Sequence, residues 1–225
     1  MGSLAVHLKA TYLQLRLSIG IVILFILLGR FAEFIVGLFT AGSDNSALSD
    51  GNLLLLILLL FATVLPLGYY KRIMHLGAGR NQYFWGLQLV YAVWAMAIAL
   101  FNCLWPMLEE KVLHRNTVDL IEAFHWNEFG IAGSFLYQTV FYLMAMALLS
   151  MLVSGFDHLV GWLLWVLFIT AIPAGTAIPA LRTHVASFFE ALLFNASLLE
   201  GVGFNLVLLF AFVAGGWYFT RRRTH

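Results

Sequence analysis

The feature that most constrains this chain is a series of apolar runs, each about 20 residues long, separated by short polar segments. A helix needs roughly 20 apolar residues to cross a bilayer core about 30 Å thick. The backbone must satisfy its own hydrogen bonds in lipid, so a spanning segment is a helix or part of a closed barrel. Barrel strands alternate apolar and polar residues, whereas residues 53–60 are continuously apolar. The sequence therefore predicts an all-α polytopic membrane protein.

Composition supports this class and excludes others. Hydrophobic residues make up 62% of the 225 positions and charged residues only 10%, whereas soluble domains carry about 25% charge. The net charge of +1 provides no electrostatic footprint for nucleic acid. We therefore expect a single transmembrane domain over residues 1–225, with the lipid bilayer as its surroundings and no nucleic-acid partner.

Six spans are predicted, preceded by a surface segment. Residues 3–16 alternate apolar and polar positions at roughly helical spacing, which is typical of an amphipathic interfacial helix; the alternative is a simple extension of the first span. Residues 181–201 are mixed in character and are expected to contain short interfacial helices. The predicted spans are 17–40, 52–70, 83–107, 130–154, 159–180 and 202–220.

The placement of lysine and arginine predicts the orientation, because cytoplasmic segments are enriched in these residues. The two termini, together with the segments after spans two and four, hold eight basic residues and one acid, Asp157. The opposite side holds three basic residues and nine acids. The first side, with both termini, is therefore predicted to be cytoplasmic. Its basic residues are Lys9, Arg16, Lys71, Arg72, Arg80, Arg221, Arg222 and Arg223.

The most informative segment is the basic stretch between spans two and three, Lys-Arg-Ile-Met-His-Leu-Gly-Ala-Gly-Arg-Asn-Gln-Tyr-Phe-Trp-Gly at residues 71–86. A short segment joined tightly to two spans can pass a rigid-body push into the membrane, and its basic residues favour the anionic leaflet. The alternative is an ordinary cytoplasmic connection with no partner, since the positive-inside rule alone accounts for its charges.

The pattern Leu76-Gly77-x-x-Arg80-x-x-Tyr83-Phe84-x-Gly86, placed after two spans, resembles the first cytoplasmic loop of ABC-2 type ABC transporter permeases. In that family the loop is a coupling helix that docks into a groove of the ATP-binding subunit. The resemblance also implies six spans, an N-terminal amphipathic helix and re-entrant helices before the last span. The outer loop at 109–129 is longer than the family pattern. Carried onto this chain, the coupling helix spans 71–84 and its partner-binding residues are Arg72, Leu76, Gly77, Arg80, Tyr83 and Phe84.

The resemblance implies a permease subunit of an ATP-driven exporter in a bacterial plasma membrane, moving an amphipathic cargo (peptide, drug or lipid-like) by alternating access. It would work as a homodimer, or as a heterodimer with a related permease. The chain lacks the sequence Gly-x-x-x-x-Gly-Lys-Ser/Thr, so ATP and Mg are expected on a separate subunit and no catalytic residue or cofactor on this one. The alternative is a membrane-embedded enzyme, or a ligand-binding membrane subunit without an ATP motor.

Two further groups of polar residues bear on function. Arg30 and Glu33 lie three residues apart on one face of span one, where charges are costly. Either they pair with each other or contact a neighbouring helix, or they line the transport path. The seven histidines are spread over both sides with none paired on a common face of one span, so no metal or haem site is predicted. The basic tails are expected to be flexible.

Overall fold

The computed structural model describes residues 16, 19–21, 23–24, 27, 47–48, 50–75, 77–108 and 117–223. The predicted interfacial helix at 3–16, most of the first span at 17–40, Leu76, and the pair of Arg30 and Glu33 lie outside the described residues.

The described chain is almost entirely helical. Its long helical segments are α2 (Leu55–Val64), which continues through the π-helix η2 (Leu65–Tyr69) into α3 (Tyr70–His75), then α4 (Arg80–Leu108), α6 (Gly130–Ser154), α7 (Leu159–Ala177), α8 (Pro179–Leu193) and α9 (Leu198–Arg222). The short elements are β1 (Ala47–Leu48), η1 (Asp50–Leu54), β2 (Thr117–Val118), α5 (Leu120–Ala123) and η4 (Trp126–Phe129).

Within the described residues, four helical segments are long and apolar enough to cross a membrane: Asn52–His75, Arg80–Pro106, Trp126–Ser154 and Leu198–Arg222. They coincide with the predicted spans two, three, four and six. The predicted span five falls on α7, which forms with α8 a pair bent by 111°, either a broken span or a re-entrant segment. The prediction of an all-α membrane protein is therefore confirmed, while the count of six spans stays a prediction.

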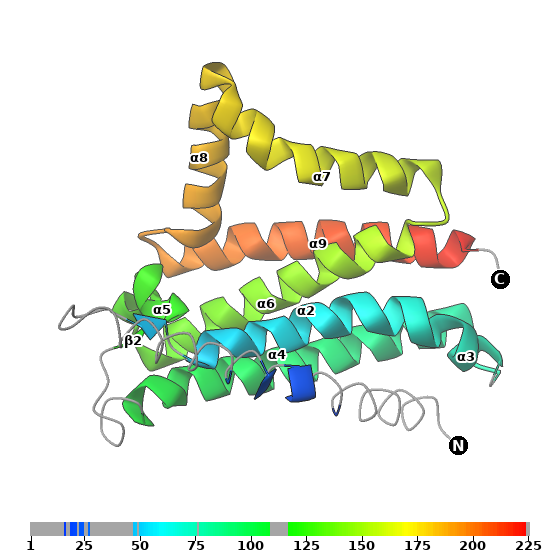
Figure 1. The fold of residues 1–225 in the computed structure, drawn as a ribbon, viewed down its shortest axis with the longest axis horizontal. Coiled ribbons are helices and arrows are strands. Elements are labelled where there is room, and N and C mark those ends of the chain that lie inside the picture. Colours follow the sequence, from blue (N-terminus) through cyan, green and yellow to red (C-terminus); the bar gives the residue numbers. More distant parts are fainter. Residues whose placement is uncertain are drawn as a thin grey trace.

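Helix α6 is the centre of the bundle and packs against α2, α4 and α9 (Figure 1). The apolar stretch of its segment is 67% buried, against 17% for that of α9. Helices α6 and α9 are in close contact at Gly201, where a Cβ atom would lie 2.5 Å from the ring of Tyr137. Glycine at this position lets the two backbones approach, as small residues do in membrane helix pairs.

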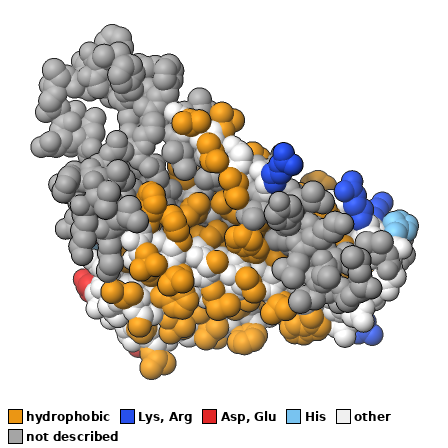
Figure 2. All heavy atoms as spheres, turned by 90° about the horizontal axis from the view of Figure 1, so that it is seen from below, with side chains coloured by type: hydrophobic (Ala, Val, Ile, Leu, Met, Phe, Trp, Pro, Cys, Tyr) orange, Lys and Arg blue, Asp and Glu red, His pale blue; other side chains and the backbone are white. Residues whose placement is uncertain are grey.

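The outward side of the bundle is apolar, as a lipid-facing surface requires. Along α4, five of the exposed large side chains are spaced at helical intervals, while Val90, Ala95 and Ala99 between them are buried. Figure 2 shows apolar side chains across the middle of one face, between a region with Lys, Arg and His and the opposite end with Asp and Glu. The five exposed residues are Leu89, Val93, Met96, Leu100 and Leu104.

The chain segments divide between two ends of the bundle. One, here named the basic end, contains residues 71–80, the turn at 155–158 and residues 221–223. The other, the acidic end, contains residues 50–52, 117–130 and 193–198 (Figure 1). Contacts between distant segments support this division: Arg80 bonds to Arg221 at the basic end, while β1 pairs with β2 at the acidic end. The segments that the charge pattern places on one side thus gather at one end.

Helix α8 joins α7 to α9 and is held at the acidic end by its C-terminal carbonyl groups. Trp126 Nε1 donates to Leu193 O at 2.8 Å, and Leu192 O accepts from Tyr137 Oη at 3.0 Å and from Asn205 Nδ2 at 3.1 Å. These donors satisfy carbonyls that the end of a helix leaves without intrahelical partners. The sharp bend before α8 comes at Ile178, which is extended because the next residue is proline. A helix of 15 residues thus occupies most of the mixed segment 181–201.

Candidate partner-binding surface

The turn between α3 and α4 is a glycine-capped chain reversal. Gly77 N donates to Met74 O at 3.0 Å and Ala78 N to Ile73 O at 3.4 Å, the bond pair of a Schellman motif. Gly77 has a φ of +85°, which side-chain-bearing residues rarely adopt, and a Cβ there would meet no atom within 4 Å. Gly77 is therefore needed for its backbone conformation, and no other described part of this chain packs against it.

The predicted coupling helix at 71–84 is not a separate helix. Residues 71–75 are the end of the helical segment that contains predicted span two. Residues 77–79 form a turn, and residues 80–84 already belong to α4. The prediction of one continuous helix over 71–84 is therefore wrong, and the role of this segment in coupling stays a prediction. The turn is the direct junction of two helices, each long enough to cross a membrane.

The structure gives Tyr83 and Phe84 a packing role. Each is 2% exposed. The Tyr83 ring lies edge-on to Tyr70 of α3 at 5.0 Å, and the Phe84 ring lies 5.3 Å from Trp217 of α9. Both side chains are therefore packed inside this chain, and neither is exposed towards a partner.

Arg80 is engaged within the chain. Its Nη1 donates to Arg221 O at 2.6 Å, which satisfies a carbonyl in the last turn of α9. The side chain thereby ties the start of α4 to the end of α9. This contact uses part of the guanidinium group of Arg80, one of the residues predicted to bind the partner.

The remaining residues of the turn form an exposed basic surface, here named the turn surface. Arg72 is exposed, with its guanidinium 5.6 Å from the ring centre of Tyr69. Of the predicted partner-binding residues, Arg72 and Gly77 are accessible, Arg80 is half-buried, and Leu76 lies outside the described residues. The turn surface carries no acidic residue and consists of Lys71, Arg72, His75, Gly77, Gly79, Asn81 and Gln82.

Beside the turn surface, Arg223 forms a clasp that the sequence did not predict. Its Nε bonds to Asp157 Oδ2 at 2.9 Å, its Nη1 donates to Pro66 O at 2.9 Å, and its guanidinium lies 4.5 Å from the ring centre of Tyr70. Arg223 is 8% exposed. The expectation of a flexible C-terminal tail is therefore wrong as far as Arg223.

The clasp depends on a local irregularity of the second span. Pro66 has no N–H group and its ring disturbs the α-helical bonding of the preceding turn, and the chain forms the π-helix η2 there. Pro66 O then accepts from Arg223. Two sequence signals hinted at this: a proline inside a span, and Asp157 as the lone acid on the basic side. Neither identifies its partner, which lies 157 and 66 residues away respectively.

Among the described residues, no group of three or more His, Cys, Asp or Glu side chains could hold a metal ion. No protein family, curated protein or solved structure matches this chain. The resemblance to ABC-2 type permeases therefore depends on the motif in residues 76–86 and on the arrangement of spans.

Proposed function

We propose that this chain is the membrane-spanning permease subunit of an ABC-2-type exporter, and that the turn surface receives a separate ATP-binding subunit. One observation carries the proposal: the turn surface is exposed and basic, yet the turn joins α3 directly to α4 and is tied to α9 by the side chain of Arg80. A docking surface must be accessible to its partner and must also move the membrane helices when it is pushed.

The contacts at the basic end would transmit such a push. The Schellman bonds fix the turn to α3, and α4 follows directly. Arg80 joins the turn to α9 through Arg221 O. Arg223 then joins the end of α9 to Pro66 and to the α6–α7 turn at Asp157. A displacement of the turn therefore acts on several long helices at once.

The full proposal has six spans and both termini in the cytoplasm of a bacterial plasma membrane. Two copies, or one copy with a related permease, would flank the cargo path, and ATP with Mg would bind the partner subunit. Closure of two ATP-binding subunits would switch the path between inward and outward access. The apolar interior suits an amphipathic cargo.

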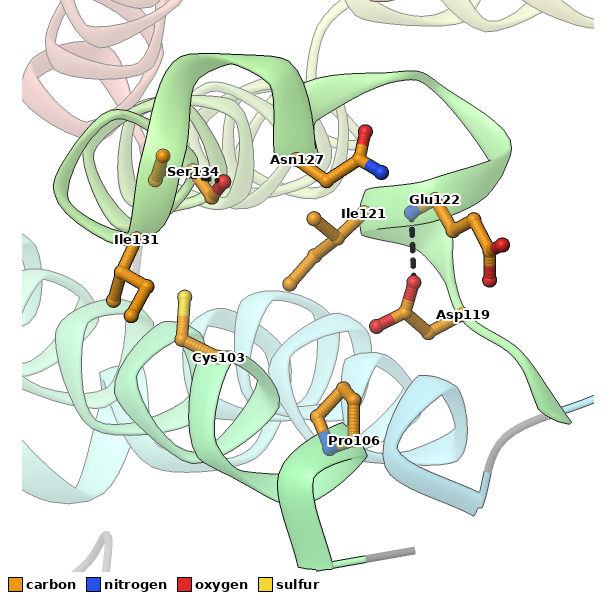
Figure 3. Close-up of a pocket in the computed structure, with 9 residues that line it drawn as sticks. Cys103, Pro106, Asp119, Ile121, Glu122, Asn127, Ile131 and Ser134 are labelled. Carbon is orange, nitrogen blue, oxygen red and sulfur yellow. Dashed lines mark hydrogen bonds between the residues drawn. The ribbon is translucent and has the colours of Figure 1, made fainter. Parts of the chain in front are cut away.

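A second candidate is a ligand-binding membrane subunit without a motor. It is favoured by a cavity of about 310 Å³ at the acidic end, far from the turn surface, which Cys103, Asp119 and Ile131 help to line (Figure 3). The two candidates differ in whether an ATP-binding chain contacts the turn surface.

The test places a photo-crosslinking amino acid at Gly79, where an added side chain meets no atom within 4 Å. The full chain is expressed in its own host, and crosslinked products are sequenced by mass spectrometry. We expect a partner containing Gly-x-x-x-x-Gly-Lys-Ser/Thr, with ATPase activity in the purified complex. Arg72→Glu should lower crosslinking and co-purified ATPase activity about tenfold, because a reversed charge adds repulsion at the interface.

Arg182→Glu is the matched control, since it reverses an exposed arginine of α8 outside the basic end. It should leave crosslinking and ATPase activity unchanged. Crosslinks that never reach an ATP-binding chain, or equal effects of the two reversals, would contradict the proposed function.

A further inference from the structure

Helix α9 has one face that no other described helix covers. The helix runs from the acidic end to the basic end (Figure 1), and its apolar stretch is 17% buried, against 39% to 67% for the other three candidate spans. Val207 and Phe210 are 67% and 69% exposed, and Ala214 and Tyr218 continue the same face toward the basic end. Their spacing of three or four residues places all four on one side of the helix, here named the α9 face.

Exposed aromatic rings mark the membrane interface at the basic end. Tyr218 is 46% exposed and lies four residues before the last residue of α9, Arg222. Trp85 and Trp162 are 59% and 56% exposed and lie within the first two turns of α4 and α7, which both start at the basic end. Tyrosine and tryptophan gather where a bilayer core meets its headgroups. Tyr218 therefore lies at the level of the headgroups.

Below Tyr218, the α9 face has the length of one leaflet. From Val207 to Tyr218 the helix rises about 17 Å at roughly 1.5 Å per residue, close to the ~15 Å of half a bilayer core. Ala211 and Ala214 are both exposed and add little bulk between Phe210 and Tyr218. An extended acyl chain can therefore lie against this part of the helix.

Arg222 brings a positive charge back to the headgroup level. Its guanidinium carbon lies 4.4 Å from the ring centre of Tyr218, one turn closer to the centre of the membrane. An arginine at the end of a span ordinarily extends toward water. Within the described part of the chain Arg222 has no acidic partner, because the acid of the basic end, Asp157, is bonded to Arg223. The phosphate groups of lipids are the anions present at this level.

We infer that the α9 face binds a phospholipid with a net negative headgroup, whose phosphate lies at Arg222 and one of whose acyl chains lies along the helix to Val207. The planar fork of an arginine matches the oxygens of a phosphate group. The other exposed basic residues of this end, Lys71, Arg72 and Arg221, keep the local potential positive and so favour an anionic over a zwitterionic lipid. This inference does not depend on the proposed ATP-driven function.

Two other occupants fit less well. A free phosphate would contact Arg222 but leave the apolar part of the α9 face uncovered. A second copy of this chain would have the same orientation in the membrane, so a two-fold contact through this face would bring both copies of Arg222 to the same depth. Like charges that meet across an interface repel each other.

Native mass spectrometry of the purified full chain tests the inference. The chain is given equal amounts of phosphatidylglycerol and phosphatidylcholine with identical acyl chains, and the first lipid bound is counted. We expect a preference of about fivefold for phosphatidylglycerol, equivalent to about 1 kcal/mol, the contribution of one arginine near an anionic headgroup. Glycerophosphoglycerol, the same headgroup without acyl chains, should not displace the lipid.

Arg222→Ala should reduce this preference to less than about twofold. Lys71→Ala is the matched control, because it removes the same charge from an exposed residue at the same end but outside the α9 face. It should leave the preference within about twofold of the wild-type value. A phosphatidylglycerol with a photoreactive acyl chain should crosslink to residues 207–218, and Arg222→Ala should lower the yield. Thermal unfolding in detergent shows that each variant is folded.

Four results would overturn the inference: equal binding of the two phospholipids, equal effects of Arg222→Ala and Lys71→Ala, displacement by the headgroup alone, or acyl-chain crosslinks confined to other helices. A dimer that retains no phospholipid would also overturn it and identify a second copy as the occupant. Because the measurement uses the isolated chain without ATP or an ATP-binding partner, its failure would leave the proposed function standing.

Discussion

At the scale of single residues, Arg223 shows how a charge is accommodated at the end of a membrane bundle. A buried guanidinium is costly unless its donors are engaged. Here two of its nitrogens bond to Asp157 and Pro66, and its planar face lies over Tyr70. Its neighbour Arg222 is exposed and contacts the ring of Tyr218 from its own helix. The two arginines are adjacent in sequence but differ entirely in what they contact.

This difference gives a direct comparison. Arg223→Ala should destabilise the bundle by about 2 kcal/mol, because it removes hydrogen bonds made by a charged donor and leaves Pro66 O unpaired. Asp157 is half-exposed and would regain water, which limits the loss. Arg222→Ala should change stability by less than about 0.5 kcal/mol. The midpoint of thermal unfolding in detergent measures both, and equal midpoints for the two variants would contradict the clasp.

At the scale of elements, the packing of α9 against α6 brings the backbone of a glycine in α9 against an aromatic ring of α6. In lipid there is little hydrophobic drive between helices, so close packing carries much of their association. Gly201 lies against Tyr137, whereas a Cβ at Gly203 of the same helix would meet no atom within 4 Å. Close packing therefore requires a glycine at position 201 but not at position 203.

Gly201→Ala should destabilise the bundle by about 1–3 kcal/mol, because the added methyl group forces the Tyr137 ring or the helix to move. Gly203→Ala should be neutral or stabilising by up to about 1 kcal/mol, since alanine is the better helix former. Thermal unfolding of the two purified variants tests this. A Gly201→Ala variant as stable as Gly203→Ala would show that α6 and α9 do not approach as described.

The elements also show what the sequence could and could not predict. Runs of apolar residues located the helices well, and predicted span 130–154 coincides with α6. The segment 71–84 was predicted to be one helix, whereas the structure has a turn at 77–79, because charge patterns do not show where helices end. Whether Tyr83 and Phe84 face inward depends on where α4 begins, at Arg80. The contacts of Arg223 and the cavity of Asp119 join distant segments, so no local pattern could reveal them.

At the scale of the whole molecule, the features with proposed roles divide between the basic end and the acidic end. The turn surface and the clasp lie at one end, and the cavity lined by Asp119 lies at the other. The positive-inside rule favours the basic end for the cytoplasm. ATP-binding subunits are cytoplasmic in the family that the motif resembles, so the proposed function requires the turn surface to face the cytoplasm.

Cysteine labelling in intact cells tests this orientation most directly. Cys103→Ala provides a background without thiols, and Gly79→Cys and Glu128→Cys each add one exposed thiol at the basic and the acidic end. With a membrane-impermeant maleimide, we predict labelling of Glu128→Cys in intact cells and of Gly79→Cys only after permeabilisation. Labelling of Gly79→Cys in intact cells would place the turn surface outside and contradict the proposed docking of an ATP-binding subunit.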